Sequence, residues 1–222
     1  MSRSMLYGLF SWLILCSSVS VRADDAENKA VESVEKLMGR VFRDTNLPGK
    51  PVFGVSLSGT KVTDAGLKEL AGLKSLTELD LDRTKVTDAG LRELAGLKNL
   101  TKLYLQRTKV TGAGLKELAG LKNLTTLWLS NTRVTDAGLK ELAGIKNLTV
   151  LILDNTQVTG MGLKELTGLK NLSLQGTQVM DAGLKELAGL KNLTLLYLHG
   201  VKVTNKSMEE LRLALPKCQI FQ

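Results

Sequence analysis

Leucine alternates with a more variable residue in short stretches that recur along the chain, as in Leu79-Asp80-Leu81. This period of two is typical of a β-strand with its leucines on the buried face and its middle residue on the opposite face. Between such stretches lie segments like residues 64–73, whose apolar residues predict a short helix that starts after Thr63 and ends at Gly72. The pattern therefore predicts one strand and one short helix in each unit.

The unit is repeated along most of the chain. The string VTDAGLKELAGLKSLTELDLDRTK begins at Val62, and related strings begin at Val86, Val110, Val134, Val158, Val179 and Val203. The spacing is 24 residues except for one of 21, between Val158 and Val179. A single unit cannot bury its leucines, whereas stacked units share one continuous core. We therefore expect an open solenoid whose strands lie side by side in a parallel sheet.

The conserved spacing within each unit is L-x-x-L-x-L-x-x-T-x-V, as in residues 76–86. It resembles the leucine-rich repeat family in its 24-residue form with a helix in each unit, and the resemblance covers residues 51–222. The resemblance implies an α/β fold, a right-handed solenoid with a concave parallel sheet of about eight strands and short helices on the convex side. It also implies recognition of a protein, or of a peptide or glycan, although a fold alone does not specify a ligand.

The N-terminal residues have the features of an export signal. Arg3 precedes an apolar run from Met5 to Cys16 that is too short for a membrane span of about 20 residues. Val21 and Ala23 are the small residues expected before a cleavage site. We expect residues 1–23 to be a signal peptide and the protein to be secreted, periplasmic or at the cell surface, without a stable membrane span after signal removal. Attachment of a lipid to Cys16 is the less favoured alternative.

Open solenoid ends need capping elements. Residues 24–50 are expected to form an N-terminal cap with a helix, a short strand and a turn at residues 47–49. The repeats would then cover residues 51–204, and residues 205–222 would form a C-terminal capping helix and the last strand. In that strand the spacing places Cys218 at an inward, buried leucine position.

The formal net charge of +8 arises mainly from columns of copied basic residues. One column lies after each helix and another after each strand, the latter formed by Lys61, Lys85, Lys109 and Arg133. No nucleic-acid-binding motif accompanies this charge. Two interpretations remain for these ridges: solvated surface, or adhesion to an anionic polymer of the cell envelope, which high salt would weaken steeply.

Catalytic chemistry has little support in the sequence. The chain has a single histidine, His199, and two cysteines, and it contains no phosphate-binding glycine loop. The aspartates at the helix starts are interpreted as helix-end electrostatics rather than a calcium site. We therefore expect a protein that is not an enzyme and that has no metal and no cofactor.

The positions that differ among otherwise similar repeats lie on the outward face of the strands. Toward the N-terminal end these positions hold the acidic residues Glu78, Asp80 and Asp82. In the following strands Tyr104, Trp128 and Ile152 lie side by side. Aromatic anchors with polar surroundings are typical of protein-binding sites, although apolar outward residues also favour strands as such. We predict that the concave face binds a protein with Trp128 at its centre. The candidate binding residues are Asp80, Asp82, Tyr104, Gln106, Trp128, Ile152 and Tyr197.

Overall fold

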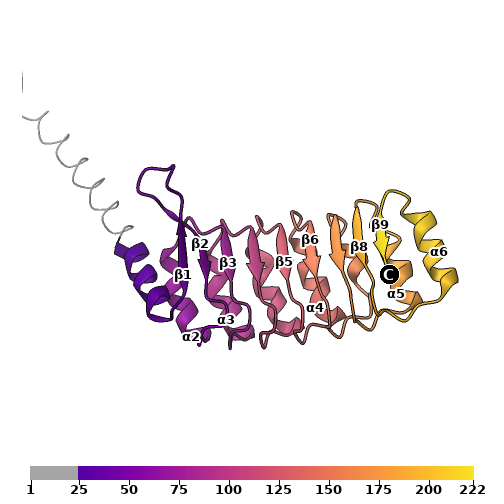
Figure 1. Ribbon diagram of the computed structural model, residues 1–222, viewed down its shortest axis with the longest axis horizontal. Helices are drawn as coiled ribbons and strands as arrows, with labels where there is room; N and C mark the ends of the chain where they lie inside the picture. The colour runs from indigo at the N-terminus through magenta and orange to yellow at the C-terminus, as the bar shows by residue number, and fades with distance from the viewer. Residues whose placement is uncertain (1–24) are drawn as a thin grey trace, which may run out of the picture.

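The computed structural model describes residues 25–222, so the expected signal peptide lies outside the described residues. These residues form one sheet of nine strands in chain order, β1 to β9 (Figure 1). The strands are β1 (Arg40–Arg43), β2 (Val52–Ser56), β3 (Glu78–Asp80), β4 (Lys102–Tyr104), β5 (Thr126–Trp128), β6 (Val150–Ile152), β7 (Asn171–Ser173), β8 (Leu195–Tyr197) and β9 (Gln219–Phe221). β1 pairs antiparallel with β2, and every later pair is parallel. The predicted solenoid with its parallel sheet is confirmed.

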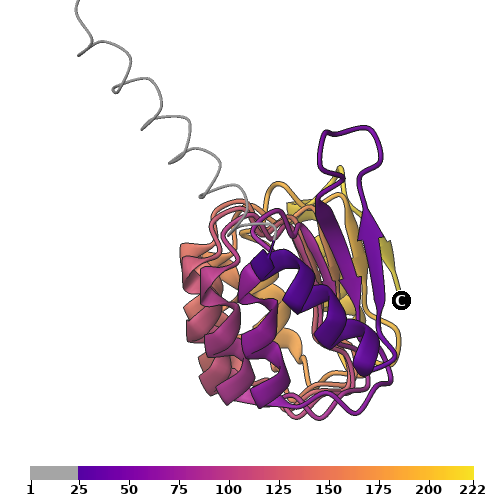
Figure 2. The ribbon, with the colours of Figure 1, turned by 90° about the vertical axis from the view of Figure 1, so that its left-hand side faces the viewer.

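Short helices form the layer opposite the sheet (Figure 2). They are α2 (Asp64–Leu67), α3 (Asp88–Glu93), α4 (Asp136–Glu141), α5 (Asp181–Leu187) and α6 (Asn205–Ala214), with the 3-10 helices η1 (Lys68–Gly72), η2 (Leu94–Gly96), η3 (Gly112–Gly120), η4 (Leu142–Gly144) and η5 (Leu163–Glu165). Residues 25–36 are also helical and lie over the N-terminal end of the stack. The leucines between the two layers form one continuous core, in which Leu79 and Leu129 have no exposed surface.

Hydrogen bonds between side chains and backbone join successive repeats. Asp88, at the start of α3, accepts from the backbone N–H of Thr111 at 2.8 Å and from its hydroxyl at 2.7 Å. We call this arrangement the Asp–Thr ladder, and it recurs in the pairs Asp64/Thr87, Asp136/Thr159 and Asp181/Thr204. The helix-end interpretation of these aspartates was therefore incomplete, because their carboxylates also bind the next repeat.

Threonine precedes most of the helices, but its side chain caps only some of them. The side chains of Thr87 and Thr111 accept from the N–H groups of Ala89 and Ala113, whereas Thr63 makes no such bond. The buried threonines that follow β3 to β7 instead donate to their own repeat, as in the 2.7 Å bond from Thr108 to the carbonyl of Leu105.

The 21-residue repeat keeps its strand and loses most of its helix. Leu169, with no exposed surface, supplies the first leucine of the strand pattern. The helical part is reduced to the three residues of η5. Gly160 and Gly162 precede it with φ of 98° and 94°, a left-handed conformation that glycine adopts without steric penalty. The short repeat therefore has a left-handed segment and a single turn of 3-10 helix in place of the longer helix of the other repeats.

The predicted register of the last strand was wrong. Ile220 pairs with Leu196, the first leucine of the neighbouring strand, whereas the sequence pattern placed Cys218 at that position. Cys218 precedes β9 and is only partly buried. The shift arises because Leu215 ends α6 and packs into the core there, instead of starting the strand pattern.

Candidate functional site

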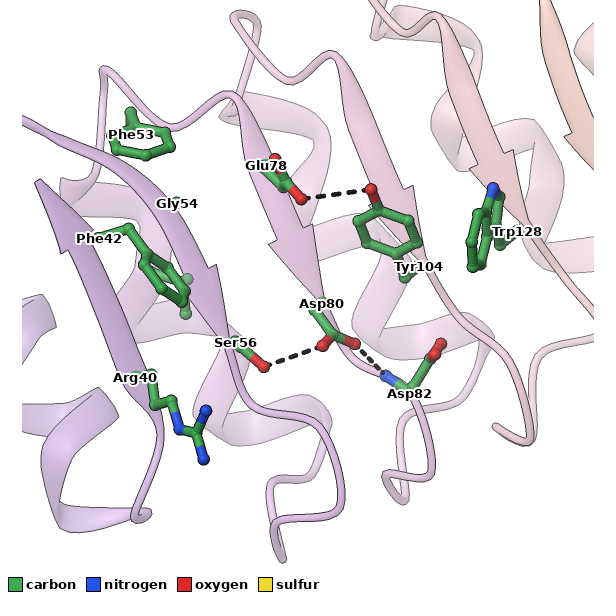
Figure 3. Close-up of a pocket in the computed structure, with 11 residues that line it drawn as sticks. Arg40, Phe42, Phe53, Gly54, Ser56, Glu78, Asp80, Asp82, Tyr104 and Trp128 are labelled. Atoms are coloured by element: carbon green, nitrogen blue, oxygen red, sulfur yellow. Dashed lines mark hydrogen bonds between the residues drawn. The ribbon is translucent and has the colours of Figure 1, made fainter. Parts of the chain in front are cut away.

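A groove of about 530 Å³ lies on the concave face at its N-terminal end (Figure 3). Strands β1 to β5 each contribute to it. The lining residues are Arg40, Phe42, Phe53, Gly54, Val55, Ser56, Glu78, Asp80, Asp82, Tyr104 and Trp128. We refer to this surface as the groove.

The groove exists because β2 presents small residues between larger neighbours. The outward positions of β2 are Gly54 and Ser56, which pair with Glu78 and Asp80 on β3. On the other side of β2, Phe42 lies against Gly54, where an added Cβ atom would come within 3.3 Å of the phenylalanine side chain. Glycine and serine therefore form a low floor, and larger side chains on the flanking strands form the walls.

Aromatic side chains stand at both ends of the groove. Phe42 and Phe53 are 46% and 39% exposed, with ring centroids 6.4 Å apart. Tyr104 meets Trp128 edge to face, with centroids 5.0 Å apart and an interplanar angle of 90°. Aromatic pairs in this arrangement are held in place by their quadrupoles as well as by area burial. The indole Nε1 of Trp128 is buried and has no hydrogen-bond partner among the described residues.

Three carboxylates lie between these aromatic groups, and donors of the protein orient each of them. Glu78 accepts from the Tyr104 hydroxyl at 3.2 Å and pairs with Lys102 at 3.1 Å. Asp80 accepts from the Ser56 hydroxyl, and Asp82 accepts from both the backbone and the side chain of Gln106. Within residues 25–222, neither aspartate forms an ion pair.

The acidic surroundings shift two pKa values. Burial raises the pKa of the Asp82 carboxyl above its ordinary value of 3.8, and the charge of Asp80 raises it further, while hydrogen bonds from Gln106 act in the opposite direction. Burial, the charge of Glu78 and the hydrogen bond to Glu78 raise the pKa of Tyr104 to about 12. Burial is the largest cause of both pKa shifts, and neighbouring carboxylates add to it, whereas the charge of Arg83 lowers the pKa of Asp82.

The structure brings most of the predicted binding residues together. Asp80, Asp82, Tyr104 and Trp128 line the groove, and Gln106 is bonded to Asp82. Ile152 lies beside Trp128 in the next strand, outside the groove. Tyr197 lies on β8, where it stacks on Phe221 with centroids 4.8 Å apart. Trp128 thus stands at one end of the hollow rather than at its centre.

Sequence reasoning missed the contribution of β1. Val41 pairs with Val55, so the alternation along β1 directs Arg40 and Phe42 to the concave face. The alternation of polar and apolar residues in Arg40-Val41-Phe42 indicates a strand. The sequence does not indicate, however, that this capping strand pairs with the first strand of the repeats. Phe53 was also missed, since it occupies a position that holds threonine in later repeats.

Neither a metal site nor a catalytic group is evident in the described part of the chain. No three His, Cys, Asp or Glu side chains of residues 25–222 are grouped so that they could hold a metal ion. His199 is exposed, and burial raises the pKa of the Cys218 thiol, which disfavours its reactive thiolate form. Among the described helices, none is both long and apolar enough to cross a membrane.

Comparisons with known proteins identify the family. The family model for two copies of leucine-rich repeats matches residues 98–144 and 122–167, and a single-repeat model matches residues 72–95. The structure is similar to internalin C2 of Listeria monocytogenes, with 33% identity, a TM-score of 0.63, and coverage of 76% of this chain and 70% of that one. A leucine-rich repeat protein of Leptospira interrogans matches with 27% identity, a TM-score of 0.51, and coverage of 70% of this chain and 45% of that one. A search of curated proteins gave no match.

The chain belongs to the leucine-rich repeat family. This fold indicates a protein-binding module. The groove is the part of the concave face from which we infer how this module binds.

Proposed function

We propose that this protein is an exported, non-catalytic leucine-rich repeat module that binds a protein through its concave face. The observation that carries the proposal is the groove, with exposed phenylalanines at one end, partly exposed Tyr104 and Trp128 at the other, and oriented polar groups between them. The binding residues would be those named from the sequence, with Arg40, Phe42 and Phe53 added and Ile152 and Tyr197 at the periphery. A peptide or a glycan could use the same surface.

The contrast between copied and varied positions supports this assignment. Core leucines are nearly identical in every repeat because the shared core requires them. The groove residues have no such role, since Tyr104 and Trp128 point away from the core and remain partly exposed. Tyrosine and tryptophan are enriched among the residues that contribute most to protein–protein binding.

The alternative, adhesion of an anionic polymer to the basic ridges, is weakened by what the lysines bind. In the column after the helices, the ammonium groups of Lys98, Lys122 and Lys191 donate to carbonyls at the helix ends of the next repeat, at 3.4, 3.1 and 3.1 Å. Positive charge at these carbonyl ends complements the helix dipole. These three lysines therefore contribute to contacts between repeats, which leaves the column after the strands as the main candidate for polymer binding.

The test is capture of binding partners from the cell envelope and the secreted proteins of the source cells. We expect a protein that the wild type retains and that both Tyr104→Ala and Trp128→Ala lose. The matched control is the double variant Lys85→Ala/Lys109→Ala, which changes a basic ridge and should retain the same protein. Retention should also persist at high salt, because short-range aromatic contacts are screened much less than exposed charges. Loss in the ridge variant would favour the polymer alternative and contradict the groove.

A further inference from the structure

The groove combines excess negative charge with aromatic walls, and this combination suits one kind of side chain. Its lining contains the three carboxylates of Glu78, Asp80 and Asp82 and one basic side chain, that of Arg40. We propose that the groove receives an arginine side chain of the protein partner, with the guanidinium bound by Asp80 and Asp82. The inference deepens the proposed function and rests on it.

The two aspartates are oriented but not neutralised. Asp80 accepts from the Ser56 hydroxyl at 2.9 Å and from the backbone N–H of Asp82 at 3.0 Å. Asp82 accepts from the backbone N–H of Gln106 at 2.7 Å and from its amide at 2.6 Å. A carboxylate has about four acceptor sites, so each aspartate can accept further hydrogen bonds. The neutral donors fix the geometry and leave the charge for a ligand.

The third carboxylate, that of Glu78, already has a cation and a hydrogen-bond donor within the protein. Lys102 pairs with Glu78 on one side, and the Tyr104 hydroxyl donates to it on the other. The chain's own guanidinium in the groove, Arg40, lies across Ser56 from Asp80 and forms no ion pair among residues 25–222 (Figure 3). Asp80 and Asp82 are thus the carboxylates of the groove that form no ion pair within residues 25–222, although the charge of Arg83 acts on Asp82.

The aromatic walls favour arginine over lysine. A guanidinium is planar, is weakly hydrated and stacks on aromatic faces, whereas an ammonium is a compact and strongly hydrated charge. Phe42 and Tyr104 flank the floor of Gly54, Ser56 and Asp80 (Figure 3). A guanidinium above this floor can meet carboxylates with its edge and a ring with its face. The partner's cation would also reduce the repulsion between Asp80 and Asp82, which contributes to the raised pKa of Asp82.

The proposal is tested with the full chain labelled with ¹⁵N and three short peptides observed by NMR. The probes are acetyl-Gly-Arg-Gly-amide, its lysine analogue and its citrulline analogue, which keeps the shape of arginine without the charge. The signals to follow are the amides of Asp82 and Gln106 and the indole of Trp128. We expect the arginine peptide to shift these signals, the lysine peptide to bind several-fold more weakly, and the citrulline peptide to give no saturable shift.

The variants Asp80→Asn and Asp82→Asn remove the charge and keep the shape. In both, the asparagine amide can still exchange hydrogen bonds with Ser56 or Gln106, so the fold should be retained. Each should lower the affinity for the arginine peptide about tenfold, as expected for loss of a charge-assisted hydrogen bond. The control Asp154→Asn changes the equivalent carboxylate after β6. Asp154 accepts from the backbone N–H of Gln175 as Asp82 does from Gln106, but it lies outside the groove, so this variant should leave the affinity unchanged.

Three results would overturn the proposal: equal binding of the arginine and citrulline peptides, equal binding of arginine and lysine, or unchanged affinity in both asparagine variants. A saturable shift of the same signals by Ca²⁺ at a lower concentration than the peptide would also overturn it, in favour of a cation site. The proposed function fails separately, if the captured protein is retained by Tyr104→Ala and Trp128→Ala.

Discussion

Thr111 and Thr135 occupy the same position in successive repeats, but only Thr111 has a ladder carboxylate facing it. The aspartate position of the preceding repeat holds Asp88 in the case of Thr111 and Gly112 in the case of Thr135. Replacement by valine keeps the shape of threonine and removes the hydroxyl. We therefore predict that Thr111→Val destabilises the protein much more than Thr135→Val does.

The magnitude follows from the bonds that each hydroxyl makes. The Thr111 hydroxyl donates to Asp88 at 2.7 Å and accepts from the N–H of Ala113 at 3.2 Å. A hydrogen bond to a charged group contributes about 1.5–3 kcal/mol and a capping bond about 1 kcal/mol. Because both groups are only partly buried, we expect a loss of about 2 kcal/mol. The Thr135 side chain makes no capping bond, so Thr135→Val should change stability by less than about 0.5 kcal/mol.

Urea unfolding followed by circular dichroism measures both values from the shift of the midpoint at an unchanged slope. The cycle of Asp88→Ala, Thr111→Val and the double variant should give a coupling energy of about 1 kcal/mol. If the two valine variants lose equal stability, or if the coupling is zero, the carboxylate bond is not what joins these repeats and the reasoning is refuted.

Leu129→Ala should cost about 2–5 kcal/mol as a buried cavity, and Trp128→Ala clearly less; equal losses in urea unfolding would contradict the inward and outward assignment. Tyr104 should ionise near pH 12 in an ultraviolet titration, so its contribution to stability is full below pH 10 and is lost between pH 10 and 12; ionisation near its ordinary pKa of 10.0 would refute this. Amide exchange should be fastest in residues 165–182 among the internal repeats, whereas uniform protection would count against a weak short repeat. The exported protein should begin at Asp24, and an intact mass that includes residues 1–23 would disprove it.

The sequence by itself determined the architecture of the repeats. The leucine spacing identified every inward position from Leu79 to Leu198, and the structure buries these side chains as predicted. The spacing also located the 21-residue unit and showed how Leu169 keeps its strand intact. This succeeded because each repeat packs against copies of itself, so a pattern within one unit specifies the contacts of all of them.

The position of the candidate site was decided only by the tertiary structure. The groove depends on β1 pairing antiparallel with β2, which brings Arg40 and Phe42 next to Gly54 and Ser56. No repeat pattern includes β1, so its register could not be deduced from the spacing of the leucines. The predicted register of Cys218 was wrong for a related reason, because α6 is longer than the α-helices of the repeats and β9 starts later than the leucine spacing predicts. The repeats follow from local periodicity, whereas the two ends depend on how non-repeated segments pack against them.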